Sequence, residues 1–326
     1  MQYRELGKSG ISVSVVGLGT WAIGGWAWGG NDDNDSIAAI RRGLDDGINL
    51  IDTAPAYGLG HSEEVVGKAI KGRPRDKIVI ATKCGLVWHT DKGTFSFEEY
   101  GKRVHRYLGP ESVRYELEQS LKLLGVDFID LYQTHWPDVT TPIADTMGEL
   151  VRLKDAGKIR AIGVSNCDIP LMKEYLAVGR IESNQPPYSM LDRGIEGELL
   201  EFCRKNSIGV LPYSPLAQGL LTGKMTPERK FKPGDWRASR KRFSPESIRR
   251  VNAMLDKFAP IREKHKVNQT QLTIGWTIAR PGITSALVGV RNPQQAADIA
   301  KGGDMVLSKD ELARMDKIIA ELGSVD

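Results

Sequence analysis

Short runs of apolar, often β-branched residues alternate along the chain with longer segments that mix apolar and polar positions. The short runs are typical of buried strands, whereas apolar residues spaced three and four apart are typical of the packed face of a helix. In residues 35–46, for example, Ile37, Ile40 and Leu44 fall on one such face. The alternation predicts strands at residues 15–18, 49–52, 78–83, 128–133, 161–165, 181–185, 209–213 and 285–288. It predicts helices at residues 35–46, 62–70, 110–124, 144–155, 171–178, 197–205, 244–264, 270–279, 293–301 and 308–321.

Several of these helices have residues at their ends that are typical of helix boundaries. Pro110 and Gly125 flank the helix at 110–124, as proline favours the first turn and glycine the position after the last. Ser308 and Glu311 have the spacing of a capping box. Ser62 is expected to open the helix at 62–70, with acidic residues in its first turn.

Eight strands that alternate with helices predict a parallel sheet. In a chain of 326 residues, this pattern favours a closed (β/α)8 TIM barrel over an open doubly wound sheet. We therefore expect a single barrel domain over residues 1–326, with an N-terminal β-hairpin and an extra C-terminal helix. Two connections, residues 84–109 and 215–243, are unusually long and follow strand C-termini, where barrels place their active sites. Both are expected to be functional loops.

Composition narrows the class of protein. The net charge of +4 is too small to indicate nucleic-acid binding. Three cysteines far apart in the sequence cannot form a disulfide framework, which suits a reducing compartment. No apolar stretch approaches the roughly 18 residues of a membrane span, and the first residues lack the apolar core of a signal peptide. We expect a cytoplasmic protein, and interpret one basic run as a solvated surface: Arg237, Arg240, Lys241, Arg242, Arg249 and Arg250.

Four residues with ionisable side chains, which could take part in acid–base chemistry, lie at or just beyond predicted strand ends. Asp52 and Lys83 end their strands, His135 follows the strand at 128–133, and Tyr57 lies five residues after Asp52. Since the C-terminal ends of barrel strands share one mouth, we expect these side chains to meet there.

Such a group can reduce a carbonyl. A tyrosine with a free pKa of about 10 is a weak acid at neutral pH, and a nearby lysine ammonium lowers that pKa toward the working range. Asp52 would supply the counter-charge that a buried Lys83 needs, and His135 would orient the substrate oxygen. Tyr57 would then protonate the alkoxide formed as hydride arrives from a nicotinamide cofactor. The five histidines show no metal-ligand spacing, so no metal is expected.

The local sequence around these residues resembles the aldo-keto reductase superfamily. The resemblance begins at INLIDTAPAYGLGHSE (residues 48–63) and extends over nearly the whole chain. It includes, in order, GLGTW (17–21), ATKCG (81–85), DLYQTHWPD (130–138), GKIRAIGVSN (157–166), NQPPYS (184–189) and PYSPLAQGLLTGK (212–224). The last motif is most similar to bacterial members related to the potassium-channel β-subunit branch.

The resemblance implies roles for individual residues. Asp52, Tyr57, Lys83 and His135 match the family's catalytic tetrad, with Tyr57 as the general acid in reduction. Other matches, together with Asp52, imply contacts to the cofactor. Near the nicotinamide they are Gly19, Thr20, Trp21, Ser165, Asn166, Gln185 and Tyr213; around the pyrophosphate they are Ser214, Leu216, Gln218, Gly219 and Lys224.

The chain departs from the family near its C-terminus. Many members have a Lys-Ser pair and a later Arg that bind the 2′-phosphate of NADP, whereas here Gly289 and Val290 stand at the pair and Gln295 at the later position. Arg291 could bind the phosphate instead, with Gln295 and Asp298 at the adenosine end. We therefore expect NADP(H) to be favoured and NAD(H) to be possible.

Aromatic side chains in the predicted loops suggest a small substrate pocket. We expect Trp21, Trp88 and Trp136 to line it beside Tyr57 and His135. Trp26, Trp28 and Tyr188 either line the pocket or pack its rim. The expected partner is a small carbonyl or polyol, with no nucleic acid or membrane. A cofactor-binding redox sensor or regulatory subunit with slow turnover is the alternative function, and the oligomeric state is open.

Overall fold

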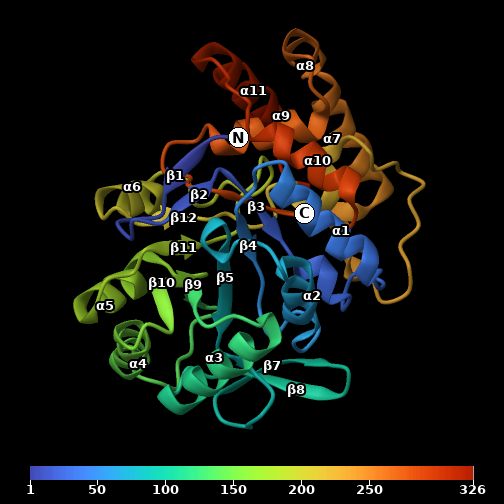
Figure 1. Cartoon of the computed structure of the whole chain (residues 1–326). Coiled ribbons are helices and arrows are strands. Elements are labelled where there is room, and N and C mark those ends of the chain that lie inside the picture. The colour runs from blue at the N-terminus through green and yellow to red at the C-terminus, as the bar shows by residue number, and fades with distance from the viewer. Residues whose placement is uncertain (326) are drawn as a thin grey trace.

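Eight parallel strands form the central sheet in a computed structural model that describes residues 1–325 (Figure 1). Their order is β12-β11-β10-β9-β5-β4-β3-β13, so sequential strands are neighbours throughout. The strands are β3 (Val16–Gly19), β4 (Leu50–Asp52), β5 (Val79–Cys84), β9 (Ile129–Thr134), β10 (Ile159–Ser165), β11 (Ser183–Gln185), β12 (Gly209–Val210) and β13 (Ala286–Gly289).

The two ends of this sheet meet, so the sheet is closed. Parallel bridges join Val210 to Ile283 and Tyr213 to Leu287. The Leu287 backbone N–H also donates to the Pro212 carbonyl at 2.9 Å. The predicted (β/α)8 barrel is confirmed.

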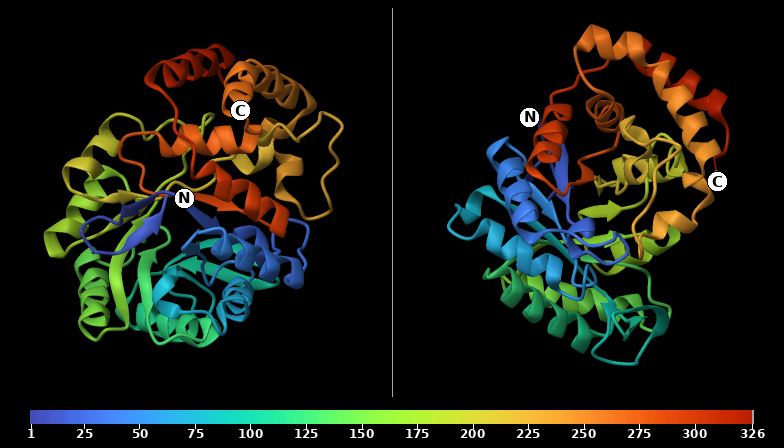
Figure 2. Two further views of the ribbon diagram at one scale, coloured as in Figure 1. Left: turned by 45° about the horizontal axis from the view of Figure 1, so that its top comes forward. Right: turned by 90° about the vertical axis from the view of Figure 1, so that its right-hand side faces the viewer.

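Eight helices cover the outside of the barrel, one after each strand (Figure 2). They are α1 (Asp33–Asp45), α2 (His61–Ile70), α3 (Pro110–Leu124), α4 (Ile143–Asp155), α5 (Ile169–Val178), α6 (Glu198–Lys205), α9 (Gln269–Ile278) and α10 (Pro293–Gly302). Three more, α7 (Pro245–Asp256), α8 (Ala259–His265) and the C-terminal α11 (Lys309–Leu322), are additions to the barrel. Among residues 1–325, no helix combines the length and apolarity needed to cross a membrane.

The helix boundaries follow the local signals with two exceptions. Pro110 begins α3 and Gly125 ends it, and Ser308 and Glu311 form the predicted capping box of α11. Ser62 does not open α2: the helix starts one residue earlier, and the Ser62 hydroxyl donates to Thr20 Oγ1 at 2.7 Å.

The predicted single helix at 244–264 is the second exception, because it is two helices. The chain breaks between Asp256 and Ala259, where the fully buried Phe258 turns inward. Pro260 then falls in the first turn of α8. A proline is accommodated there because its missing N–H has no partner in that turn.

The N-terminal hairpin, β1 (Tyr3–Glu5) and β2 (Ser12–Ser14), closes one end of the barrel. Leu6, Ile11 and Val13 join one apolar cluster with inward-facing strand residues such as Leu50 and Leu131. The hairpin precedes the first strand and covers its N-terminal end. The opposite mouth, at the strand C-termini, is left for a site.

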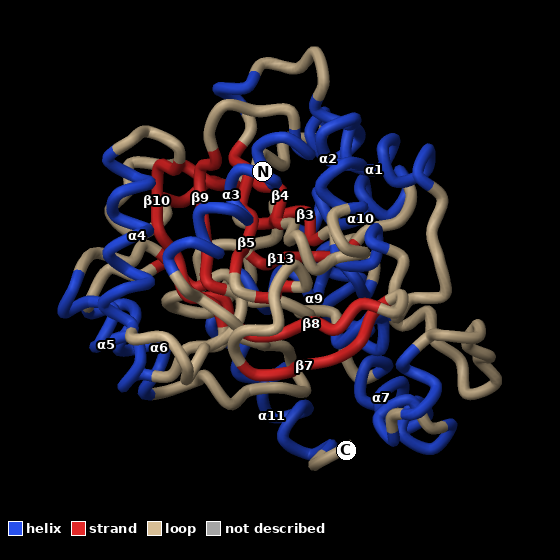
Figure 3. Tube along the Cα trace, turned by 90° about the horizontal axis from the view of Figure 1, so that it is seen from below, coloured by secondary structure: helices blue, strands red, loops and turns tan. Residues whose placement is uncertain are grey.

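The connection at 84–109 is not a plain loop. It forms a three-stranded antiparallel sheet of β6 (Leu86–Val87), β7 (Thr94–Glu99) and β8 (Lys102–Arg106), separate from the barrel strands (Figure 3). Leu86 and Val104 pack with Ala56 of the loop that contains Tyr57. This small sheet therefore forms a wall beside the mouth.

The connection at 215–243 lacks strands and α-helices. It contains only short 3-10 turns, η3 (Ala217–Thr222), η4 (Trp236–Ser239) and η5 (Lys241–Phe243), and similar turns occur as η1 (Trp21–Gly24) and η2 (Arg75–Lys77). We call residues 214–243 the clasp loop.

Candidate active site

The four residues of the expected tetrad meet at the C-terminal mouth of the barrel. Lys83 lies in β5, fully buried, and its ammonium donates to Asp52 Oδ1 at 2.8 Å, the Thr53 carbonyl at 3.0 Å and Tyr57 Oη at 3.1 Å. All three donors of the ammonium are therefore used. Asp52 is the last residue of β4, and Tyr57 is in the loop that follows.

His135 completes the group from the end of β9. Its ring lies 5.7 Å from the Tyr57 ring, centroid to centroid and nearly perpendicular to it. Its backbone N–H donates to the Cys84 carbonyl at 2.9 Å, which ties the residue to β5. Burial, Lys83 and Arg106 hold the pKa of His135 well below its usual range. The imidazole is therefore neutral and can donate one hydrogen bond without adding charge.

The buried ion pair determines the proton chemistry of Tyr57. Burial by itself would lower the pKa of Lys83, but Asp52 and Tyr57 outweigh it and the pKa is raised, so Lys83 is a cation. Burial raises the pKa of Tyr57, and the Lys83 ammonium offsets only part of that rise. The sequence predicted the downward effect of Lys83 correctly, but the net shift is upward because burial is the larger effect.

Asp52 is held from its other side by two amides. Gln185, at the end of β11, donates to Asp52 Oδ2 at 2.8 Å, and Gln133 of β9 donates to the same oxygen at 3.4 Å. Gln185 was expected to contact the nicotinamide. Its amide nitrogen instead contacts Asp52 of the tetrad, so its amide oxygen is the polar atom left for another partner. Gln133 was not identified from the sequence.

Ser165, Asn166 and Tyr213 form a connected cluster next to His135. Asn166 donates to the His135 carbonyl at 3.0 Å and accepts from the Tyr213 hydroxyl at 3.0 Å. Ser165 donates to the Gln185 carbonyl at 2.8 Å. Asn166 has a positive φ of 58°, which turns its amide away from the strand direction. Three residues predicted around a nicotinamide are thus adjacent in space.

β3 and β13 both end in glycine, so no side chain covers the backbone there. Gly19 and Gly289 are paired across these two strands, and a Cβ placed on either would meet nothing closer than 3.5 Å. Backbone of this kind allows a flat ligand to approach closely. Thr20, next to Gly19, is fully buried, and its hydroxyl donates to the Asp52 carbonyl at 3.0 Å, so its side chain shapes the loop.

The clasp loop begins with a run of left-handed backbone. Ser214, Ala217, Gln218 and Gly219 have φ values of 56°, 44°, 54° and 103°, and Leu216 precedes the first 3-10 turn. Turns of this kind bring successive N–H groups to one side, where they can bind an anion. Ala217 and Gly219 donate their N–H groups to the Ser214 and Leu216 carbonyls within these turns, so the N–H groups of Ser214, Leu216 and Gln218 are left for an anion such as the pyrophosphate of a dinucleotide.

A buried ion pair braces the clasp loop internally. Arg237, only 5% exposed, forms two hydrogen bonds to Asp235 and donates to the Gln218 carbonyl at 3.0 Å. Its guanidinium also stacks on Trp28, 4.8 Å from the ring centroid. The interpretation of Arg237 as part of a solvated surface is therefore wrong. Its close spacing to Asp235 in a long loop was the one signal for this anchor.

The residues expected at the adenosine end lie around the start of α10. Gln295 accepts from the Arg291 backbone N–H at 2.8 Å, and Asp298 pairs with Lys224 at 3.3 Å. The Arg291 guanidinium lies 5.4 Å from the Trp28 ring centroid. The side chains of Gln295, Asp298 and Lys224 therefore already have protein partners. Arg291 has the ring contact and a longer-range electrostatic interaction with Asp235, without a hydrogen bond from its guanidinium to a described residue.

The aromatic residues separate into three groups. Trp21 contacts Trp28 and Trp236 beneath the clasp loop. Trp88 and Trp136 pack with Phe97 at the small three-stranded sheet, and Trp26 stacks on Phe97 at 5.1 Å. Tyr188 is fully buried and stacks on Trp276, so it belongs to the core and not to the pocket.

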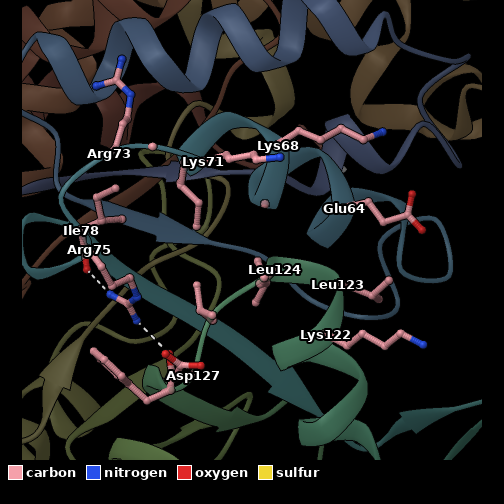
Figure 4. A pocket seen from close by; sticks show the side chains of 16 residues that line it. Glu64, Lys68, Lys71, Arg73, Arg75, Ile78, Lys122, Leu123, Leu124 and Asp127 are labelled. Atoms are coloured by element: carbon pink, nitrogen blue, oxygen red, sulfur yellow. Dashed lines mark hydrogen bonds between the residues drawn. The ribbon is translucent and has the colours of Figure 1, made fainter.

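A separate surface cavity of about 690 Å³ lies at the other end of the barrel, between the C-terminal ends of α2 and α3 (Figure 4). Lys68, Lys71 and Lys122 lie at its rim, and Ile78 and Phe128, which precede β5 and β9, are part of its wall. It therefore has no contact with the tetrad. Among residues 1–325, no three His, Cys, Asp or Glu side chains are grouped so as to hold a metal ion.

Comparison with known proteins gives consistent matches over the full chain. The sequence model of the Aldo/keto reductase family matches residues 15–320. An NADH-specific methylglyoxal reductase of Escherichia coli (strain K12) is 43% identical over 303 residues, which cover 91% of this chain and 92% of the relative. The structure of a glycerol dehydrogenase from Gluconobacter oxydans superposes with a TM-score of 0.88 at 38% identity, covering 98% and 96% of the two chains. An aldo-keto reductase from Klebsiella pneumoniae in complex with NADPH superposes with a TM-score of 0.72 at 29% identity, covering 97% and 95%.

Proposed function

Because this chain belongs to the aldo/keto reductase family and so is an oxidoreductase of carbonyl and alcohol groups that uses a nicotinamide cofactor, we propose that Tyr57 is its proton donor. The substrates are small aldehydes or ketones, or the matching alcohols and polyols in the reverse direction. The observation that supports this most strongly is the hydrogen bond from the buried Lys83 ammonium to Tyr57 Oη, next to a neutral His135.

The side chains act on the substrate oxygen. The nicotinamide, when bound, supplies hydride to the carbonyl carbon in reduction and accepts it in oxidation. Tyr57 gives its phenolic proton to the oxygen as negative charge develops there. Lys83 stabilises the phenolate that remains, since its ammonium is 3.1 Å from Oη. His135 donates a hydrogen bond to the same oxygen and fixes its direction.

Asp52 positions Lys83 rather than the substrate. Its carboxylate neutralises the buried ammonium and is itself held by Gln185 and Gln133. An ammonium fixed by three acceptors cannot move away when Tyr57 changes charge, so the cost of reorganisation during the reaction is small.

The cofactor is proposed to lie between the bare strand ends and the clasp loop. Ser165, Asn166 and Gln185 would contact the nicotinamide carboxamide, and Tyr213 would stack on the ring. The backbone of Ser214, Leu216, Gln218 and Gly219, with Arg237 behind it, would bind the pyrophosphate. Gly19 and Gly289 leave room for that approach.

We propose that NADP(H) is favoured and NAD(H) accepted. Arg291 supports NADP(H), since no carboxylate is within ion-pair distance of its guanidinium, although Asp235 is close enough to interact with it electrostatically, and it can therefore bind a phosphate. Gly289 and Val290 supply no charge there, so discrimination is modest. The Escherichia coli relative is named as NADH-specific and the Klebsiella pneumoniae structure contains NADPH, so both cofactors occur among similar proteins.

Steady-state assays with NADPH or NADH against methylglyoxal and 4-nitrobenzaldehyde test the proposal. An enzyme should show turnover in the range of about 1–10³ s⁻¹ with at least one of them. Oxidation of bound cofactor once per chain, with slow exchange and no sustained turnover, would instead favour the redox-sensor alternative.

A further inference from the structure

Arg106 is a cation without a protein counter-ion at the substrate side of the mouth. It is the last residue of β8 and pairs with Leu86 and Thr94 through its backbone. Its guanidinium lies over the Trp136 ring, 4.8 Å from the centroid. Its Nε is buried and has no hydrogen-bond partner, and no carboxylate of residues 1–325 forms an ion pair with it.

Its position connects it to the reacting oxygen. Trp136 directly follows His135, and the charge of Arg106 contributes to the lowered pKa of that histidine. Trp136 packs against the same apolar cluster of Ala56, Leu86 and Val104 as Trp88, at the wall of the expected pocket. A molecule with its carbonyl at Tyr57 and His135 would therefore extend toward this guanidinium.

Two other arginines stacked on tryptophans, both well buried, show what is missing here. Arg237 lies over Trp28 and pairs with Asp235, and Arg280 lies over Trp276 and pairs with Asp316. In both cases an aspartate uses the guanidinium donors. Arg106 has the same stacking without the acid, and a buried donor without an acceptor is unfavourable.

We propose that Arg106 binds a carboxylate of the substrate, so that the preferred substrates are small aldehydes or ketones that also have a carboxylate group. This inference rests on the proposed function of the site, because the carbonyl must be held at Tyr57. A guanidinium presents two parallel N–H donors that match the two oxygens of a carboxylate, and stacking on Trp136 keeps its plane fixed. Hydride and proton transfer to the carbonyl are unchanged.

A matched pair of substrates tests the charge alone. 4-Carboxybenzaldehyde and 4-nitrobenzaldehyde have planar groups of similar shape at the same ring position, but only the first has a net charge. Both are assayed with the parent chain, with Arg106→Gln and with Arg106→Lys. The control is Arg103→Gln, which removes an exposed arginine from the same strand that also stacks on an aromatic ring, Phe95.

The measured quantity is the ratio of kcat/KM for the carboxylate over the nitro substrate, taken relative to the parent, because the nitro group activates its carbonyl to the same extent in every chain. It should fall about 10- to 100-fold in Arg106→Gln, mainly through KM, as expected for loss of a charged hydrogen bond. Arg106→Lys should recover part of the ratio, and Arg103→Gln should keep it. Equal losses on both substrates, or an unchanged ratio, would overturn the inference.

Benzoate binding, followed by the quenching of tryptophan fluorescence, gives a readout that needs no turnover. Benzoate should bind the parent and bind Arg106→Gln at least about tenfold more weakly. If the parent reduces neither aldehyde, the proposed function has failed whatever the benzoate result. If both aldehydes are reduced and benzoate binds equally to both chains, the proposed function stands and the role of Arg106 is wrong.

Discussion

The tetrad and the clasp loop occupy the same mouth of the barrel but are held in place by different means. Asp52, Lys83 and His135 lie in or next to strands, and the ion pair between Lys83 and Asp52, with the Gln185 amide that supports it, joins strand residues. The clasp loop has no strand and starts with left-handed backbone. The ion pair between Arg237 and Asp235 braces it internally, and ion pairs from Arg242 to Asp192 and from Lys224 to Asp298 tie it to the rest of the protein.

This difference in how the two regions are held matches their proposed tasks, which are proton transfer for the tetrad and cofactor binding for the clasp loop. Proton transfer depends on distances that must not change, so three of its four groups lie in or next to strands and Tyr57, in the following loop, is held by its hydrogen bond to Lys83. A cofactor must enter and leave, so the segment that covers it needs an open and a closed state. A few side-chain contacts in an otherwise irregular loop allow both. The predictions below test this division, beginning with the largest effect.

Removing the proton donor should disable chemistry without disturbing the clasp loop. Tyr57→Phe is expected to lower kcat/KM by roughly 10²–10⁴, the usual contribution of a positioned acid. Cofactor affinity, measured by fluorescence titration, should stay nearly the same because the ring remains. Tyr115→Phe, at an exposed tyrosine of α3, is the control. Similar kcat/KM values for Tyr57→Phe and the parent would refute the assignment.

Removing the ammonium should change both rate and pH dependence. Lys83→Met is expected to lower kcat by roughly 10²–10³, as for loss of a preorganised charged donor. Reduction needs protonated Tyr57, so it persists below the raised pKa and falls above it, whereas oxidation needs the phenolate and rises with pH.

Without Lys83 the pKa of Tyr57 rises further, so at a given pH oxidation should lose more than reduction. This is measured by the rates of oxidation and reduction from about pH 6 up to about pH 10, the pKa of a free tyrosine. Lys122→Met, at an exposed lysine of α3, is the control. Equal losses in both directions at every pH would contradict the tuning of Tyr57 by Lys83.

Near the clasp loop, the charge of Arg291 should affect the preference between NADPH and NADH and leave the chemical step unchanged. Arg291→Ala is expected to lower kcat/KM with NADPH more than with NADH, by about 1.5–3 kcal/mol for a charged hydrogen bond. The ratio of the two efficiencies in parent and variant is the measurement. An equal loss with both cofactors would mean that Arg291 contacts only what they share, and the preference for NADP(H) would be abandoned.

The smallest effect concerns the movement of the clasp loop itself. At a cofactor concentration ten times Kd, trypsin should cut residues 214–243 about tenfold more slowly than without cofactor. Arg237→Gln should be cut faster in both conditions, because the anchor to Asp235 and Gln218 is lost. Cofactor-independent cleavage in the parent would show that the loop does not close.

Local signals in the sequence were sufficient for the barrel and for the tetrad. Strand and helix periodicity depends on near neighbours, and Pro110, Gly125 and the capping box at Ser308 define helix ends within a few residues. Once the strands alternate with helices, their C-terminal ends must share one mouth. Asp52, Lys83 and His135 therefore had to meet, whatever the details of packing.

The small sheet at residues 84–109 was missed although it has a local signal. In residues 94–98 two phenylalanines alternate with polar residues, and Tyr100 and Gly101 form a turn with positive φ at both positions. This pattern is typical of a hairpin. The hairpin is an insertion into the barrel, so the alternation of one strand with one helix does not predict it.

Tertiary structure alone decided which polar groups pair and how deeply each is buried. Nothing near Gln185 in sequence indicates that its amide contacts Asp52, 133 residues away, and nothing near Arg237 shows that Trp28 lies beneath it. The net pKa shift of Tyr57 likewise depends on burial by distant segments, which outweighs the local effect of Lys83. Desolvation and pairing are sums over neighbours in space, and a sequence specifies those neighbours only through the completed fold.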